Sequence, residues 1–278
     1  MTRRTVWINN PHYLKDFENN LDTNKIISED KNIFISCCNK RIAEKLLSKN
    51  FEAIRVGKEA ILNLNNDHFT SAKLKESIRA GLRCGKMKEY RYSRETEDKL
   101  EEFKSACTHG DEPQIRYFFK TELSESVRLF VFVDEEGNWL GALTLRESYG
   151  NKVKTELLLR KKGAPNGVME ALIYEVFLKL KRKGFEYWSL GEVPYVVYDS
   201  MFFSKEYWIN FWGRRTKFAY NYYGLFRFKN KFKPDWNDVF ICTKRRLNII
   251  ILFRILTESN LIILILYKAL LIFTQFNS

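Results

Sequence analysis

Cysteine and histidine are scarce in this chain of 278 residues, which contains only 5 Cys and 3 His. No CxxC pair occurs, so these residues do not provide the ligand spacing of a zinc site. We therefore expect free thiols in a reducing compartment and no bound metal. The first twenty residues lack the apolar segment of a secretory signal peptide, so secretion is not indicated. The chain also has no short repeat and no low-complexity linker.

Aromatic and basic residues, in contrast, are abundant. The 22 Phe, 14 Tyr and 6 Trp can fill a substantial core, and the 45% hydrophobic and 29% charged content is that of a globular protein. The length allows two domains or one large domain. Lys and Arg number 47 against 34 Asp and Glu, which gives a formal net charge of +13. This charge favours an anionic partner, without choosing among nucleic acid, anionic lipid and phosphate groups.

The C-terminal segment 246–278 differs in composition from the rest of the chain. Two apolar stretches follow a basic flank and are interrupted by Arg254, by residues 257–260 and by Lys268. A spanning helix needs about 20 largely apolar residues, although an i,i+4 pair of Arg254 and Glu258 would reduce the cost of a charge in lipid. We predict a membrane-associating tail whose helices lie in the interface. A transmembrane span and a buried or dimer-forming helix are the alternatives.

Hydrophobic periodicity and capping residues predict the elements of the first third of the chain. The expected elements are a strand at 32–36, a helix at 41–47 capped by Asn39, strands at 51–56 and 60–64 with a turn at Gly57-Lys58, a basic helix from Ser71 to about Met87, and a second helix from about Ser93 to Ala106.

The clearest pattern lies between residues 127 and 190. Three antiparallel strands at 127–133, 139–145 and 153–159 are expected, followed by a basic loop at 160–167, a helix at 168–183 and a strand at 186–190. This order resembles the GNAT acyltransferase scaffold. There the loop before the central helix offers backbone N–H groups to an anionic group of the acyl donor. Asn166 and Gly167 stand in that loop, and a purely structural turn is the alternative interpretation.

Three segments make a family resemblance specific: 164–172, with Ala-Pro-Asn-Gly-Val-Met; 184–194, with Trp-Ser-Leu-Gly-Glu; and 222–236, with Lys-Asn-Lys-Phe-Lys-Pro-Asp-Trp. Their order and spacing resemble the C-terminal catalytic domain of the phosphatidylglycerol lysyltransferases, the multiple-peptide-resistance-factor family, over about residues 30–243. Two positions depart from the family pattern. Glu170 stands where Asp is expected, and Glu192 stands where relatives often carry an apolar residue.

The resemblance implies the fold and its division. It implies an α+β fold with mixed α/β sheets, made of tandem GNAT-like acyltransferase units joined by a basic helix and followed by an apolar helical tail. On this basis residues 1–95 hold the first unit and the linking helix. Residues 96–245 hold the second, catalytic unit, and residues 246–278 form the tail.

The resemblance also implies an activity: transfer of an amino acid, lysine or another, from aminoacyl-tRNA to a lipid headgroup, with phosphatidylglycerol as the first candidate. Aminoacyl-tRNA and an anionic phospholipid membrane would be the partners, no cofactor is needed, and the enzyme would work at the cytoplasmic face of the membrane, peripheral or anchored by the tail. One alternative is a GNAT-type transferase using acyl-CoA or aminoacyl-tRNA on a protein or peptide. Another is a non-catalytic scaffold that binds membrane or RNA.

The candidate catalytic residues are Lys229, Lys231 and Glu192. The two lysines match the family motif and would stabilise an oxyanion or a phosphate, although a Lys-x-Lys run can also be a solvated edge. Glu192 follows a predicted strand and would act as a base or hold the substrate ammonium group, unless it is a surface or paired carboxylate. Asp199 is a weaker candidate.

Further residues are assigned to binding. The expected substrate-binding residues are Asn166, Gly167, Arg227 and Tyr223, and the expected tRNA-binding residues on the basic helix are Arg79, Arg83, Lys86 and Lys88. A solvated helix face is the alternative for the second set, and a core position for the tyrosine. Because an extended segment around Arg227 would not sort its aromatic and basic residues onto separate faces, a turn is expected there. The histidines His12, His68 and His109 are expected to be ordinary surface or capping residues.

Overall fold

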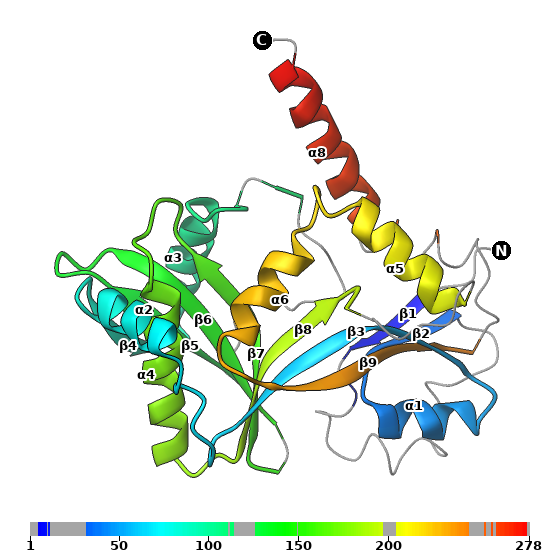
Figure 1. The fold of residues 1–278 in the computed structure, drawn as a ribbon, viewed down its shortest axis with the longest axis horizontal. Helices are drawn as coiled ribbons and strands as arrows, with labels where there is room; N and C mark the ends of the chain where they lie inside the picture. The colour runs from blue at the N-terminus through cyan, green and yellow to red at the C-terminus, as the bar shows by residue number, and fades with distance from the viewer. Residues whose placement is uncertain are drawn as a thin grey trace.

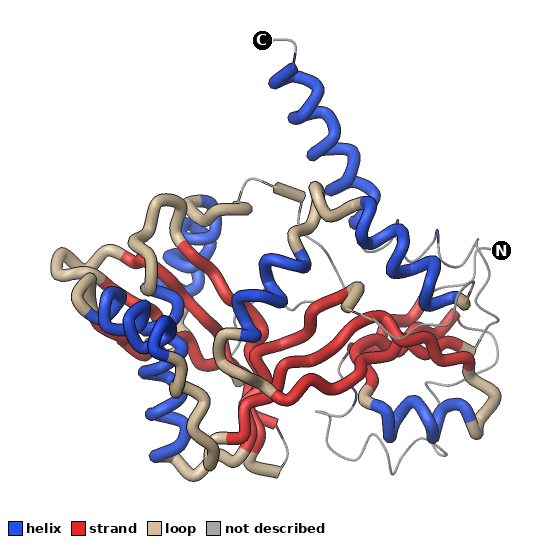
Figure 2. Tube along the Cα trace, viewed as in Figure 1, coloured by secondary structure: helices blue, strands red, loops and turns tan. Residues whose placement is uncertain are grey.

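A computed structural model describes residues 5–9, 11, 32–110, 112–113, 126–148, 150–196, 204–244, 253, 257 and 260–276. Its centre is one mixed sheet of nine strands in the order β1-β2-β9-β3-β8-β7-β6-β5-β4 (Figures 1 and 2). The strands are β1 (Thr5–Asn9), β2 (Asn32–Cys38), β3 (Glu52–Asn63), β4 (Lys86–Tyr90), β5 (Val127–Val133), β6 (Trp139–Ser148), β7 (Lys152–Arg160), β8 (Tyr187–Pro194) and β9 (Asp235–Thr243).

Helices cover both faces of this sheet (Figure 1). They are α1 (Lys40–Leu47), α2 (Ala72–Leu82), α3 (Arg94–Ser105), α4 (Val168–Arg182), α5 (Lys205–Arg215), α6 (Tyr222–Asn230) and α8 (Leu261–Phe276). Helix α1 packs on β9 and β3 and α5 packs on β3, from opposite sides of the sheet. Helix α2 packs on α4. The mixed α/β fold class is confirmed.

The expected antiparallel strands, central helix and following strand are present. Strands β5, β6 and β7 pair antiparallel, α4 follows, and β8 returns parallel to β7. The Asp134–Asn138 turn joins β5 to β6 with Gly137 at φ +88°, a conformation that favours glycine. Alternate residues of β5 face different helices: Phe130 and Phe132 pack with α2 and α4, whereas Leu129 and Val131 pack with α3. Burial on both faces explains why β5 is a nearly continuous apolar run.

Strands β7 and β8 pair over only a short stretch. Their parallel register runs from Lys152↔Tyr187 to Lys154↔Ser189, although β7 continues to Arg160 and β8 to Pro194. Beyond that stretch β8 keeps its antiparallel pairing with β3 on its other edge. The two strands therefore separate inside the sheet, and α6 lies over the separation (Figure 1).

Strand β9 comes late in the sequence but lies between β2 and β3. It pairs antiparallel with both, with Thr243 opposite Phe34 on one side and Glu52 on the other. The predicted boundary near residue 95 therefore does not divide the sheet into two separate sheets. The division into units at 1–95 and 96–245 stays a prediction.

Two predicted elements were wrong in extent. The basic helix ends at Leu82, not near Met87, and β4 begins at Lys86. Gly85 lies so close to β5 that a Cβ there would stand 2.0 Å from the Val133 carbonyl oxygen, and strand pairing therefore replaces the helix. Strand β3 is also one strand rather than two, because the expected turn at Gly57-Lys58 is an irregularity in its pairing with β9.

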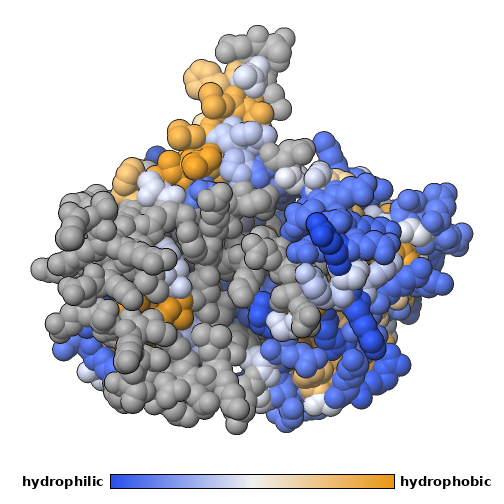
Figure 3. Space-filling view, turned by 180° about the vertical axis from the view of Figure 1, so that it is seen from behind, coloured by the Kyte–Doolittle hydropathy of each residue, from blue (hydrophilic) through white to orange (hydrophobic). Residues whose placement is uncertain are grey.

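The C-terminal helix α8 leaves the body of the protein and carries much of the hydrophobic surface seen from behind (Figures 1 and 3). Leu261 and Leu264 are buried against Ala219 at its base. Of the helices within the described ranges, none is both long enough and apolar enough to cross a bilayer. Arg254 and Glu258, the predicted pair in the tail, lie outside the described residues.

Candidate functional site: a buried lysine cluster between two separating strands

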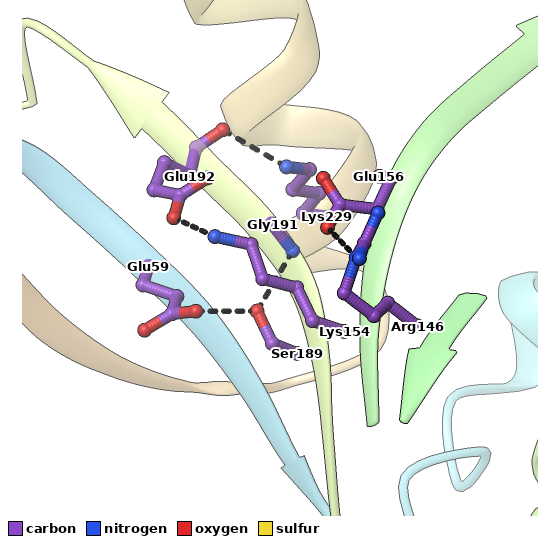
Figure 4. A network of polar contacts seen from close by, with 8 residues as sticks. All are labelled: Glu59, Arg146, Lys154, Glu156, Ser189, Gly191, Glu192 and Lys229. Atoms are coloured by element: carbon purple, nitrogen blue, oxygen red, sulfur yellow. Dashed lines mark hydrogen bonds and ion pairs between the residues drawn. The ribbon is translucent and has the colours of Figure 1, made fainter. Parts of the chain in front are cut away.

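A cluster of buried charged and polar side chains occupies the separation between β7 and β8 (Figure 4). Lys154 comes from β7, Ser189 and Glu192 from β8, Glu59 from β3 and Lys229 from α6. Each of these five residues is less than 9% exposed. Charged side chains are rarely buried unless they are paired, so this cluster is a candidate functional site.

Lys154 and Glu192 form the central ion pair. The Lys154 Nζ atom donates to Glu192 Oε1, and both side chains are buried. Burial by itself would lower the pKa of Lys154, but the negative charges of Glu192 and Glu59 outweigh it and raise that pKa above its ordinary value. Lys154 is therefore a permanent cation at neutral pH, and the Glu192 carboxylate is held by it.

Lys229 has the opposite character. Its Nζ atom donates to the backbone carbonyl of Glu192 at 3.0 Å, and its side chain is buried. Burial lowers its pKa to about 7, because the nearby carboxylates Glu192 and Glu59 only partly offset desolvation and Lys154 adds repulsion. Near neutral pH much of Lys229 is thus an uncharged amine that can accept a proton.

The backbone of β8 passes close beside this amine. Gly191 has φ +87°, and a Cβ there would lie 3.4 Å from Lys229 Nζ and 3.5 Å from the Thr155 carbonyl oxygen. The adjacent Ser189 hydroxyl donates to Glu59 Oε1 at 2.6 Å and accepts from the Gly191 N–H at 3.0 Å. These bonds fix the β8 backbone beside Lys229. On the neighbouring strands, Arg146 Nε lies 2.9 Å from Glu156 Oε1.

The helical geometry of α6 determines which of its side chains are buried and which are exposed. Asn221 caps it by accepting from the Gly224 N–H at 2.9 Å, and the helix continues to Asn230. Helical rather than extended geometry sends Lys229 inward while Arg227 and Tyr223 remain exposed. Tyr223 is 53% exposed and so is not a core residue.

Lys231 joins two of the sequence motifs. It follows α6, and its Nζ atom lies 2.7 Å from Glu170 Oε1 in the first turn of α4. The segments 164–172 and 222–236 are therefore in direct contact, although 61 residues separate the two partners. The Lys231 side chain is 47% exposed, so its charge remains accessible to a ligand.

The predicted anion-binding turn is used for helix packing. Gly167 precedes α4 at φ +90°, and a Cβ there would come within 2.1 Å of the Ser77 carbonyl oxygen on α2. A Cβ at Gly81 of α2 would in turn come within 2.2 Å of the Gly167 carbonyl oxygen. The contact accounts for Gly167 structurally, whereas Asn166 is exposed. Substrate binding by these two residues stays a prediction.

The four predicted tRNA-binding residues are exposed but do not share one helix. Arg79 lies on α2 and Arg83 directly follows it, whereas Lys86 and Lys88 lie on β4. The placement of the two lysines on the helix was wrong. Their partners in β5 are Val133 and Val131, whose side chains face α3, so the lysines point away from α2.

Other candidates have ordinary surroundings or lie elsewhere. The ring of His68 is buried between the carbonyl groups of Phe232 and Asn63, and His109 pairs with Glu112 at the surface. Asp199 and His12 lie outside the described residues. A surface hollow of about 720 Å³ is lined by Glu89, Arg128 and Lys179 among others, and does not include the lysine cluster.

Sequence reasoning missed three members of the cluster. Lys154 follows Lys152 at the spacing of an outward-facing strand edge, so nothing in the sequence marked it as buried. Glu59 offered a weak signal, since it follows Lys58 and directly precedes the apolar residues 60–62 of β3. Ser189 offered none.

The strand order, the α4 helix and the separated β7 and β8 strands define a mixed α/β protein built on one nine-stranded sheet. Within that class, the chain belongs to the family described as phosphatidylglycerol lysyltransferase, C-terminal, whose sequence model matches residues 27–243. The predicted family is thereby confirmed.

Known relatives agree with this assignment. A phosphatidylglycerol lysyltransferase of Bacillus subtilis is 24% identical over 213 residues, which is 70% of this chain and 24% of that protein. This chain thus spans about a quarter of that relative. The structure of L-PGS from Bacillus licheniformis has the same fold, with a TM-score of 0.67, 18% identity and coverage of 97% of this chain and 83% of that chain. The C-terminal domain of a putative lysylphosphatidylglycerol synthetase from Agrobacterium fabrum is also similar, with a TM-score of 0.63 and 18% identity. That comparison covers 84% of this chain and 72% of the other.

Proposed function

We propose that this chain transfers an amino acid, lysine or another, from aminoacyl-tRNA to a lipid headgroup, with phosphatidylglycerol as the first candidate acceptor. The observation that carries the proposal is Lys229, a buried amine placed between two separated strands in a chain of this family. The similarity to a phosphatidylglycerol lysyltransferase of Bacillus subtilis supports lysine and phosphatidylglycerol as the first pair to test.

The reaction needs a proton acceptor and a stabilised oxyanion. The acceptor hydroxyl attacks the ester carbonyl, a tetrahedral oxyanion forms, and the 3′ hydroxyl of the tRNA leaves. Lys229 takes the proton from the attacking hydroxyl and returns it to the leaving oxygen, which its pKa of about 7 allows. The Glu192 carboxylate is already engaged in the buried ion pair with Lys154. Lys231 stabilises the oxyanion or a substrate phosphate through its accessible charge.

The test is a transfer assay with purified protein, charged tRNA and phosphatidylglycerol vesicles, read by mass spectrometry of the lipids. Lys229→Met should lower the rate at least about 100-fold, since a positioned base contributes about 10²–10⁴-fold. Lys233→Met is the matched control, because this exposed lysine of the same motif contacts Thr70 instead. Absence of any aminoacyl lipid across several amino acids would remove the proposal.

The same assay separates the tRNA route from an acyl-CoA route. A GNAT-type use of acyl-CoA requires the turn before α4 to receive an anionic group, and here Gly167 packs on α2. We therefore expect activity that is destroyed by ribonuclease and is not restored by acyl-CoA. Activity that survives ribonuclease would favour the acyl-CoA alternative.

We further propose that the protein works at the cytoplasmic face of the membrane and is held there by its tail. Aminoacylated lipid would carry an added positive charge, reduce the negative surface potential and weaken the binding of cationic antimicrobial peptides. Cutting after Arg246 should shift the protein from the membrane fraction to the supernatant. Retention of the truncated protein on membranes would contradict the role of the tail.

A further inference from the structure

Helix α8 exposes an apolar stripe. Its base is packed through Leu261 and Leu264, while its opposite side is open. The open side carries Ile263, Leu266, Leu270 and Phe273, which are 52%, 59%, 66% and 72% exposed. Spacings of three, four and three residues put these four side chains on one face of the helix. A contiguous exposed apolar face of this kind marks an interaction site.

The corner between α5 and α6 has a different but complementary composition. Arg214, Arg215 and Lys217 are exposed there, next to Phe218, which is 45% exposed. Trp208 on α5 is 43% exposed. Of the seven Lys and Arg in residues 204–230 and 260–276, Lys229 is buried, and Lys205 and Lys268 pair with Glu52 and Glu112. The exposed positive charge of this region therefore comes from Arg214, Arg215, Lys217 and Arg227. Exposed aromatic rings beside cations are the combination found where proteins meet the headgroups of anionic lipids.

The corner is joined to the base of α8 by a packing contact. Ala219, the residue after Phe218, packs against Leu261 and Leu264 at the base of α8. Tyr195 and Tyr220 join this contact and also pack with Val193, the neighbour of Glu192 on β8. Tyr195 and Tyr220 therefore connect the base of α8 to the strand that carries Glu192.

We propose that the α5–α6 corner and the apolar stripe of α8 form one docking face for an anionic phospholipid bilayer, which places α6 at the level of the lipid headgroups. The charge of the corner selects anionic over zwitterionic lipid, and the stripe enters the acyl region. The inference extends the proposed function from the tail to the catalytic body, and only its consequence for lipid transfer rests on that function.

Sedimentation with vesicles of mixed phosphatidylglycerol and phosphatidylcholine, and with phosphatidylcholine alone, tests the docking face on the full chain. Leu266→Glu/Leu270→Glu should weaken binding to the mixed vesicles about 100-fold, since each leucine leaves the acyl region. Arg214→Gln/Arg215→Gln/Lys217→Gln should weaken it about fivefold for each charge removed and should leave the weak binding to phosphatidylcholine alone little changed.

Matched controls lie on other parts of the surface. Leu47→Glu/Leu178→Glu alters two leucines that are 50% and 38% exposed on α1 and α4, and should keep wild-type vesicle binding. Lys162→Gln/Lys181→Gln/Arg182→Gln removes three exposed charges elsewhere and should have a smaller effect than the corner variant. Equal losses in control and test variants would overturn the proposal. A fall in oligomer mass in Leu266→Glu/Leu270→Glu without vesicles would overturn it in favour of a second copy of this chain.

Failure of this inference is distinguishable from failure of the proposed function. In the transfer assay, Leu266→Glu/Leu270→Glu should lower the ratio of transfer on vesicles to transfer on detergent-dispersed lipid about tenfold or more. An unchanged ratio would overturn the docking face. If no protein transfers in either format while vesicle binding follows the expected pattern, the docking face stands and the proposed function fails.

Discussion

Two buried lysines in the same cluster have pKa values shifted in opposite directions. At Lys154 the charges of Glu192 and Glu59 outweigh the cost of burial, so this lysine stays charged. At Lys229 the same two carboxylates offset only part of that cost, and the pKa falls to about 7. Residue type alone does not distinguish them, since both are lysines in short basic stretches of the sequence. The difference comes from their positions on β7 and α6, and it makes Lys229 the residue best suited to proton transfer.

The pH dependence of stability should report Lys229. Its pKa in the folded protein, about 7, lies below the ordinary 10.5, so between these values the unfolded chain holds a proton that the native protein lacks. The contribution of Lys229 to the free energy of unfolding therefore rises by about 1 kcal/mol per pH unit between about pH 7 and 10.5, and does not change with pH below about pH 7. In urea unfolding from pH 6 to 10, the free energy of unfolding of Lys229→Met should exceed that of the wild type by the largest amount at the acid end.

A pH-independent difference between Lys229→Met and wild type would contradict this assignment. Lys233→Met, at an exposed position, keeps Lys229 and should therefore retain the pH dependence of the wild type.

The buried ion pair should behave differently from surface pairs. Lys154→Met leaves Glu192 buried without its main partner and should cost about 3–5 kcal/mol in urea unfolding. Lys154→Met/Glu192→Leu should cost less than the sum of the two single variants. Lys40→Met, which breaks a pair with Glu44 on exposed side chains, should cost less than about 1 kcal/mol. Additive effects at the buried pair would show that the two charges are not coupled.

At the scale of elements, α2 and α4 meet through glycines rather than through large side chains. Gly81 and Gly167 allow backbone contact between the two helices at a point where any side chain would collide with a carbonyl group. This close approach places α4, and with it Glu170, where Lys231 can reach it. The contact between Lys231 and Glu170 thus depends on the packing of α2 against α4 at Gly81 and Gly167.

Gly167→Ala should separate the cost of this contact from the cost of backbone conformation. Positive φ costs a non-glycine residue about 1–2 kcal/mol. At Gly167 an added Cβ would also collide with the Ser77 carbonyl oxygen, at a distance of 2.1 Å. Gly163→Ala is the matched control, because Gly163 has φ +79° and open space. We expect a loss of about 1 kcal/mol for Gly163→Ala and at least about 3 kcal/mol for Gly167→Ala in thermal unfolding. Similar losses would mean that the helices adjust to the added methyl group.

Local patterns predicted elements well and their partners poorly. The strands flanking Asp134–Asn138 and the helix after Gly167 follow from periodicity and turn residues within about 15 positions. The end of α2 was missed because the helical pattern continues to Met87, and only pairing with β5 turns that segment into a strand. Of the site, Glu192, Lys229 and Lys231 came from the family motifs. Lys154 and Glu59 become recognisable only when β3, β7 and β8 are brought together.

At the scale of the whole molecule, the positive charge is spread over several faces. Arg79 and Arg83 lie with α2 on the α4 side of the sheet, and Lys86 and Lys88 point toward α3. One RNA helix cannot lie along both sides at once. Because Lys231 contacts α4, the α2 side is the one continuous with the proposed site.

Salt titration of the proposed tRNA binding should reveal which face is used. Each lost phosphate contact lowers the slope of log affinity against log salt by about 0.9. We expect Arg79→Gln/Arg83→Gln to reduce the slope by about 1.8, and Lys86→Gln/Lys88→Gln to leave it nearly unchanged. Equal reductions by both pairs would contradict use of a single face.

The position of β9 has a consequence for biosynthesis. Strands β2 and β3 leave the ribosome well before β9, yet within the described sheet the partner that joins them is the segment Asp235–Thr243. A nascent chain stalled before that segment would expose two open hydrogen-bonding edges. Completion of this part of the sheet therefore waits until translation has passed Thr243, and chaperone demand should peak during that interval.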